Sequence, residues 1–132
     1  MYPSRHFILS LIFSILLFPL YNYNIILIFL SAFFIDADHY LWYVLKFKNF
    51  NFRQAYNYHV ESKEKDKLHI AHTVEFWILI LILSFYFRFF YFILLGIIFH
   101  NILDLIYELV KQTKKNRALS IIAWLIRHSK SF

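Results

Sequence analysis

The fold of this chain is decided by residues 89–110, which read FFYFILLGIIFHNILDLIYELV and are almost entirely apolar. A helix of about 20 such residues is long enough to cross the hydrocarbon core of a bilayer. The stretch nevertheless carries His100, Asp104 and Glu108. Because an ionisable side chain in hydrocarbon costs at least about 2.5–3.5 kcal/mol, each of these needs a physical reason. The stretch therefore predicts a membrane helix that carries a polar site.

Three further apolar stretches precede this one, at residues 6–20, 25–45 and 68–87. The first is short for a span, so tilt or local thinning of the bilayer must compensate. Arg88 marks a tight turn between the third and fourth stretches. We predict an all-α, polytopic membrane protein, with one helical domain over residues 1–132 that forms a compact bundle of about four transmembrane helices.

The composition supports residence in a membrane. The 132 residues are 61% hydrophobic and 23% aromatic, which is more apolar surface than a soluble domain of this size can bury. Arg5 and the apolar run after it resemble a signal peptide, but residues 19–22 lack the small side chains that signal peptidase needs. We therefore expect a retained helix. The absence of Cys excludes thiolate metal sites and cysteine catalysis.

The basic residues predict the orientation of the spans. The formal net charge of +6 could indicate nucleic-acid binding, but the basic residues flank apolar segments and form no stripe, so no nucleic-acid partner is expected. One Lys or Arg precedes the first span, six lie in residues 46–67 and six follow the fourth span, against Arg88 alone on the other side. By the positive-inside rule, both termini and the loop at residues 46–67 are cytoplasmic.

The remaining polar segments carry weaker signals. Residues 118–127, with Trp124 and flanking basic residues, are too short to cross a bilayer and predict a C-terminal helix lying in the interface. The mixed-charge run at residues 61–67 is typical of a solvated loop or helix face. We expect His59 and His128, in polar or tail segments, to lie at the surface.

Histidines and carboxylates gather near the predicted cytoplasmic ends of the four spans. With this orientation they lie at a similar depth, about 10–15 Å from the helix ends for those in the second and fourth spans, at about 1.5 Å per residue. We expect them to share one polar site. They are His6, Asp36, Asp38, His39, His69, His72, Glu75, His100 and Asp104.

The spacing of these residues indicates metal binding. His100 and Asp104 are four residues apart, and Asp36 and His39 are three apart, so each pair shares a helix face. A carboxylate commonly orients a metal-ligating His. Asp36 and Asp38 lie about 200° apart on an ideal helix, so either the helix is distorted there or one of them does not touch the metal. His and carboxylate ligands without thiolate suit divalent Zn, Mn or Fe.

Four short motifs, in order, resemble a known family: Arg5-His6-Phe7, residues 34–39 (FIDADH), residues 69–73 (HIAHT) and residues 96–104 (GIIFHNILD). Their order and spacing are similar to the YdjM-like family of LexA-regulated, membrane-bound, predicted metal-dependent hydrolases. Phe34-Ile35 stands where that family has Leu-Pro, and Lys67 stands where it has a first His. The resemblance implies a compact helical bundle in a prokaryotic cell membrane. It also implies that His6, Asp36, Asp38, His39, His72, His100 and Asp104 are the site residues.

Three functions are consistent with this pattern. The first is a metal-dependent hydrolase of a lipid-type or lipid-linked ester or phosphoester at the cytoplasmic face. Its metal ligands would be His6, Asp36, Asp38, His72, His100 and Asp104, and its proton-relay or orienting residues His39, His69 and Glu75. The second is a non-catalytic metal- or proton-binding membrane protein related to transport. The third is a structural protein whose His–Asp pairs hold helices together, which is the commoner role of a single such pair.

Overall fold

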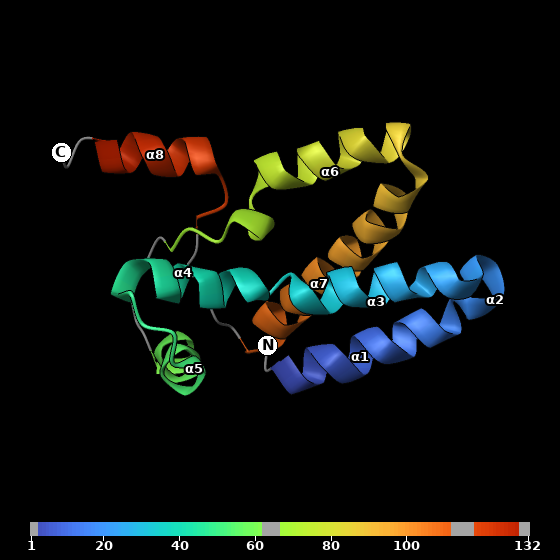
Figure 1. Cartoon of the computed structure of the whole chain (residues 1–132), viewed down its shortest axis with the longest axis horizontal. Helices are drawn as coiled ribbons and strands as arrows, with labels where there is room; N and C mark the ends of the chain where they lie inside the picture. The colour runs from blue at the N-terminus through green and yellow to red at the C-terminus, as the bar shows by residue number, and fades with distance from the viewer. Residues whose placement is uncertain (1–2, 62–66, 112–117, 130–132) are drawn as a thin grey trace. The chain divides into compact units, whose positions relative to one another are not determined.

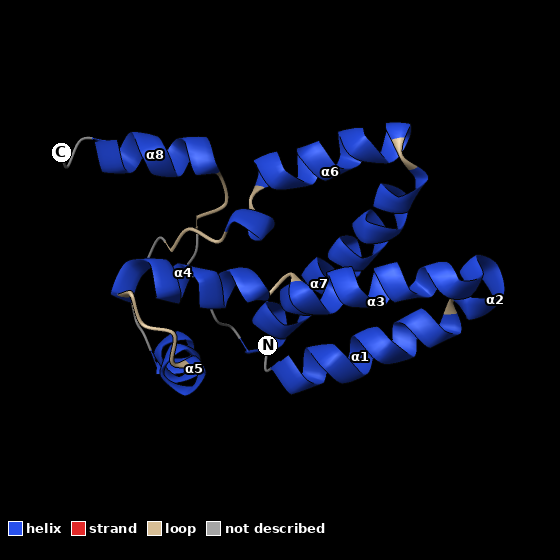
Figure 2. Cartoon of the chain, viewed as in Figure 1, coloured by secondary structure: helices blue, strands red, loops and turns tan. Residues whose placement is uncertain are grey.

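A computed structural model describes residues 3–61, 67–111 and 118–129. The chain divides into two compact units, residues 1–35 with 77–114 and residues 36–76 with 115–132. Throughout the described ranges the elements are helices joined by loops (Figure 2). The prediction of an all-α fold is therefore confirmed.

A helical hairpin forms one side of the first unit. It consists of α1 (Pro3–Leu16), α2 (Phe18–Tyr21), η1 (Asn22–Asn24) and α3 (Ile25–Phe34), and α1 packs against α3 (Figure 1). The chain reverses at Asn22, whose φ of 48° lies in the left-handed region that Asn tolerates better than most residues. The predicted first span, residues 6–20, thus becomes α1 followed by a short turn of helix at Pro19.

The long helix α7 (Arg88–Lys111) completes the first unit and packs against both α3 and α1. At Gly96, α7 lies so close to α3 that there is no room for a side chain. A Cβ atom placed there would collide with Ser31 Oγ and the Ile28 carbonyl oxygen, and would lie 2.9 Å from the Ala32 nitrogen. Only glycine therefore permits this packing distance, which brings the backbone of α3 within reach of His100, one turn further along α7.

The second unit contains α4 (Ala37–Phe47), α5 (Phe52–Glu61), η2 (Ile70–His72) and α8 (Ile121–Ser129). α4 ends at Lys48, which has a φ of 52°, and α5 packs against α4. The side chain of Asn51 accepts a hydrogen bond from the Gln54 N–H at 3.0 Å and so caps the start of α5. The predicted cytoplasmic loop at residues 46–67 therefore contains a helix, and its residues 62–66 lie outside the described ranges.

The predicted spans at residues 25–45 and 68–87 differ from the observed helices. The first is broken at Ile35–Asp36 into α3 and α4, because the α3 hydrogen bonds stop at Ile35 and a turn precedes α4. The second begins only at Val74 with α6 (Val74–Tyr86), since His69 is extended and Ile70–His72 form a 3₁₀ turn. Hydrophobicity alone could not reveal either break.

Among the described residues, one helix, α7, is long and apolar enough to cross a membrane, and a second candidate exists if Arg5–Leu16 and Phe18–Phe34, bent by 57°, form one span. Large apolar side chains of α7 are exposed, including Ile98, Ile102 and Leu105 at 47–52%. The prediction of four spans stays a prediction.

Candidate metal centre

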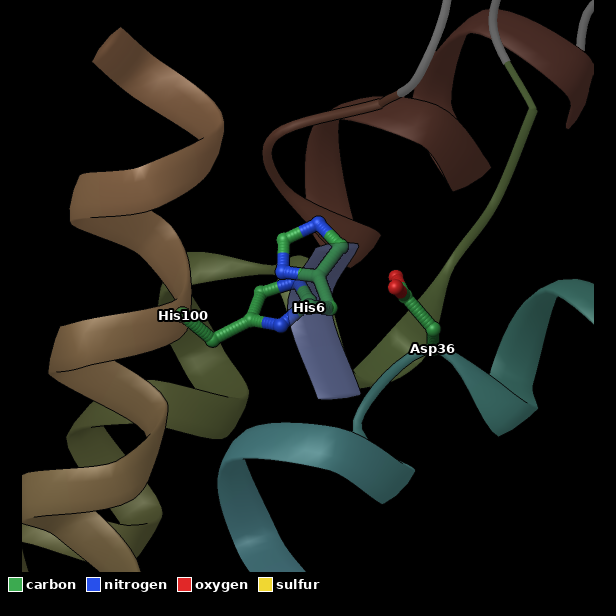
Figure 3. A group of neighbouring side chains, drawn as sticks. All are labelled: His6, Asp36 and His100. Atoms are coloured by element: carbon green, nitrogen blue, oxygen red, sulfur yellow. The ribbon is translucent and has the colours of Figure 1, made fainter. Parts of the chain in front are cut away.

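Two histidines and one carboxylate are buried together in the first unit. His6 Nε2–H donates to Asp104 Oδ1 at 3.2 Å, and His100 Nδ1–H donates to the Ala32 carbonyl oxygen at 2.8 Å. The rings of His6 and His100 are stacked, with centroids 4.2 Å apart and planes within 15° (Figure 3). All three side chains are buried, with at most 8% of the residue surface exposed.

The bond from His100 to Ala32 fixes the tautomer of the neutral ring. Because Nδ1 carries the hydrogen, Nε2 carries the lone pair, and it lies 3.9 Å from Asp104 Oδ2. Sequence spacing predicted that His100 and Asp104 share a helix face, and the structure places them so. His6 joins them from α1, 98 residues away in the chain from Asp104.

Asp38 organises a second group, in the second unit. Its Oδ1 accepts from His39 Nδ1 at 2.8 Å, and its Oδ2 accepts from His72 Nδ1 at 3.1 Å and from the Ala71 backbone N–H at 3.0 Å. A carboxylate that accepts from the Nδ1–H of two imidazoles directs their Nε2 lone pairs elsewhere. This is the arrangement that commonly orients metal-ligating histidines.

Asp36 stands at the entry of the chain into α4 (Figure 3), and its Oδ1 lies 3.6 Å from His72 Nε2. Asp36, His39 and His72 can each place one ligand atom within 4.8 Å of the other two, and so can Asp38, His39 and His69. The break before α4 is the distortion that the sequence predicted as one of two alternatives for these aspartates. The second unit thus holds groups of His and Asp close enough to bind a metal ion.

The surroundings of His69 indicate whether this group suits a cation. It is 2% exposed, and its ring is stacked on that of His39 with centroids 3.9 Å apart. His69 Nδ1 is buried, has no hydrogen-bond partner in the described part of the chain, and lies 3.9 Å from Asp38 Oδ1. Leaving a buried polar atom unsatisfied costs about 1–3 kcal/mol. A divalent ion held by His69 and its neighbours would remove that cost, so the residues fit a metal.

His59 is a member of this group that the sequence did not indicate. It is half-buried, its Nε2–H donates to the His39 carbonyl oxygen at 2.7 Å, and its ring lies 5.2 Å from that of His39 and 5.5 Å from that of His69. Burial, followed by the nearby His39, lowers the pKa of His59 to about 4. The expectation of a surface histidine is therefore wrong for His59, because α5 folds back onto α4.

The structure places Glu75 apart from the histidines. Its carboxylate accepts hydrogen bonds from the Ser120 hydroxyl at 2.5 Å and from the backbone N–H groups of Ile121 and Ile122 at 3.0 and 3.2 Å. These groups form the N-terminus of α8, so Glu75 caps that helix across 45 residues of sequence. This position differs from the orienting or proton-relay role expected for Glu75.

The predicted site residues thus fall into two groups and one exception. His6, His100 and Asp104 meet in the first unit; Asp36, Asp38, His39, His69 and His72 meet in the second; Glu75 joins neither. The expectation of one site shared by all four helices stays a prediction.

Fold and site define an all-helical protein with His–Asp groups that can hold a metal. No family model, no curated protein and no solved structure matches the chain. The resemblance to YdjM-like proteins therefore stays a prediction.

Proposed function

We propose that the chain is an integral membrane, metal-dependent hydrolase that acts on a lipid-type or lipid-linked ester or phosphoester at the cytoplasmic face. The observation that carries this proposal is the second-unit group, in which Asp38 orients two imidazoles and His69 Nδ1 lies buried beside it, without a hydrogen-bond partner among the described residues.

The residues of this group divide into ligands and orienting groups. Asp36 and the Nε2 atom of His72 are the natural ligand pair, because His72 Nδ1 is already held by Asp38. His39 belongs to both ligand groups, and His69 completes the one that includes Asp38. Nitrogen and carboxylate ligands suit divalent Zn, Mn or Fe.

A divalent ion at this site would supply a Lewis acid and a water molecule that ionises near neutral pH. The chain itself would hold and move protons. His39 donates its Nδ1–H to Asp38 Oδ1 at 2.8 Å, so its Nε2 would accept a proton and the carboxylate would stabilise the imidazolium that forms. His69, stacked on His39, would offer its Nδ1 lone pair to an ion shared with Asp38.

A location in the bilayer would suit a lipid-type substrate. α7 and the exposed apolar side chains of α1 and α6 suit a lipid environment, and the basic residues favour a cytoplasmic position for residues 46–67. The second-unit group lies directly before and after this loop in the chain, so a substrate whose headgroup is at the cytoplasmic surface would meet it.

In the first unit, the hydrogen bonds of the histidines favour a structural role for the group of His6, His100 and Asp104. The bonds from His6 to Asp104 and from His100 to Ala32 tie α1, α3 and α7 together without a metal. We propose that this cluster contributes stability to the helix bundle, whichever activity the second unit has.

The test is metal analysis of the full chain purified in detergent, with variants Asp36→Ala, His72→Ala and His100→Ala. We expect bound Zn, Mn or Fe in the wild type and its loss from the first two variants. His100→Ala should lower the melting temperature and keep the metal. Glu108→Gln, a carboxylate change outside both groups, is the control.

A wild type without metal at neutral pH would exclude both the hydrolase and any other metal-binding function. Where metal is bound, ester and phosphoester substrates with and without acyl chains separate catalysis from simple binding. Activity that disappears with chelation and returns with metal is the result expected.

A further inference from the structure

A side-chain hydrogen bond joins α5 to the backbone of the metal-ligand group. His59 Nε2–H donates to the carbonyl oxygen of His39 at 2.7 Å, a short bond between side chain and backbone. It comes from residues 46–67, the segment that the sequence predicted to be a cytoplasmic loop. The inference drawn from this contact rests on the proposed function and concerns how the ligand residues of that site are positioned.

The contact fixes His59 as well as His39. A carbonyl oxygen can only accept, so Nε2 must carry the hydrogen. The ring is then oriented edge-on to His39, with centroids 5.2 Å apart and planes at 61°. His59 also lies 5.5 Å from the ring of His69. It therefore contacts both imidazoles that belong to the Asp38 ligand group.

The position of His39 explains why such support is needed. His39 belongs to the first turn of α4, directly after the break at Ile35–Asp36, where the helix has no preceding turn to hold it. Its side chain is held by Asp38, which is tied in turn to Ala71 and His72. The bond from His59 adds an anchor from α5 on the backbone of His39 itself.

We propose that His59 is a positioning residue of the metal centre, which holds the first turn of α4 and the ring of His39 in the geometry that binds the ion. His59 is in neither ligand group of the second unit, so it acts through His39 and does not bind the ion itself. Replacing such an outer partner typically weakens metal affinity about 10–100-fold.

The experiment uses the full chain in detergent, stripped of metal and titrated with Co²⁺, whose visible spectrum reports ligand geometry. The variants are His59→Ala, His59→Gln and His59→Asn. Gln places an amide N–H near the position of Nε2, whereas Asn is one methylene shorter. His128→Ala is the matched control, because His128 also bonds a backbone carbonyl, that of Trp124, at 3.0 Å.

We expect His59→Ala and His59→Asn to weaken Co²⁺ binding about 10–100-fold and to shift its spectrum. His59→Gln should recover most of both, and His128→Ala should match the wild type. Wild-type affinity in His59→Ala would overturn the proposal. Equal losses of Co²⁺ affinity in the Gln and Asn variants would also overturn it, because they would indicate that only the shape of the ring matters.

Two outcomes separate this inference from the proposed function. If the wild type binds no Co²⁺, the metal centre fails, and the role of His59 fails with it. If the wild type and His59→Gln bind Co²⁺ with the same spectrum and His59→Ala binds it more weakly, the centre and the inference both stand. Should His59→Ala fail to fold, by circular dichroism, the contrast between Gln and Asn decides.

Discussion

At the scale of single residues, the two aspartates of the FIDADH motif have different surroundings. Asp38 accepts three hydrogen bonds, and Asp36 Oδ1 lies 3.6 Å from His72 Nε2 and 3.7 Å from His39 Nδ1. A carboxylate engaged by three donors orients its neighbours, and the distances from Asp36 to the two imidazoles allow all three to bind one ion. Asp38 and Asp36 therefore differ in their expected response to substitution.

Asp38→Asn keeps the shape of the side chain but removes its charge and turns one acceptor into a donor. We expect a fall in metal affinity of about 10–100-fold and a changed Co²⁺ spectrum, because one of the two imidazoles, His39 or His72, loses its acceptor oxygen. The measurement is Co²⁺ titration of the purified chain. Metal affinity equal to that of the wild type would contradict the orienting role of Asp38.

At the scale of elements, helix contacts are set by small side chains and by caps. The buried face of α1 consists of His6, Ser10 and Ser14, each at most 1% exposed and four residues apart, and small residues of this kind let helices approach closely. Gly96 does the same for α7 against α3. α8 is held at its N-terminus by Glu75 and through the edge-on contact of Trp124 with Trp42.

Gly96→Ala tests the close approach of α3 and α7. Alanine favours a helix over glycine by about 1 kcal/mol, but the new Cβ would collide with backbone atoms of α3 that cannot rotate away. Overpacking of this kind costs about 1–3 kcal/mol, so we expect a net loss of stability. Thermal melts in detergent measure it.

The control for Gly96→Ala is Leu105→Ala, at a position on the same helix that is 52% exposed and should change the melting temperature little. The double variant Ser31→Ala with Gly96→Ala removes one of the collisions and leaves those with the backbone. It should recover only part of the loss, and full recovery would mean that Ser31 alone sets the spacing.

Glu75→Ala should release the N-terminus of α8. Its three acceptor bonds to residues 120–122 disappear, so α8 should unfold at a lower temperature than the rest of the chain. Glu75→Gln keeps an acceptor oxygen and should have a smaller effect. Fluorescence of Trp124, in a background with Trp42 and Trp77 replaced by Phe, follows the change. Loss of metal at an unchanged melting temperature would instead support the proton-relay or orienting role.

At the scale of the whole molecule, the length and apolarity of the helices decide which of them can cross a bilayer. α7 meets the length and apolarity of a span by itself, and α1 with α3 does so as a bent pair. The distribution of Lys and Arg favours four crossings, because it places almost all basic residues on one side. The two-span topology, with α1 and α3 as one bent span, and the four-span topology place Asn51 on opposite sides of the membrane when the N-terminus is cytoplasmic.

Single cysteine substitutions decide between them, since the natural chain has none. Asn22→Cys and Asn51→Cys both replace exposed residues between helices. With four spans, a membrane-impermeant maleimide should label Asn22→Cys from outside intact cells and Asn51→Cys only after the membrane is opened. Labelling of Asn51→Cys from outside would exclude the four-span topology.

The sequence by itself determined the helical class, the apolar segments and most of the residues that could bind metal. These follow from composition and from spacings of three and four residues, which are local properties of a helix. The prediction that both aspartates of residues 36–38 could contribute only with a distorted helix also came from local geometry, and a break stands at that point.

Only the tertiary structure decided which of these residues meet. His6 reaches Asp104 across 98 residues, His59 turns inward onto His39, and Glu75 turns to α8. No periodicity encodes these pairings, because each depends on how one helix packs on another. Apolar patterning marks where a helix is buried, but partners distant in sequence are chosen by close packing, such as that at Gly96, and by the need to satisfy buried polar groups.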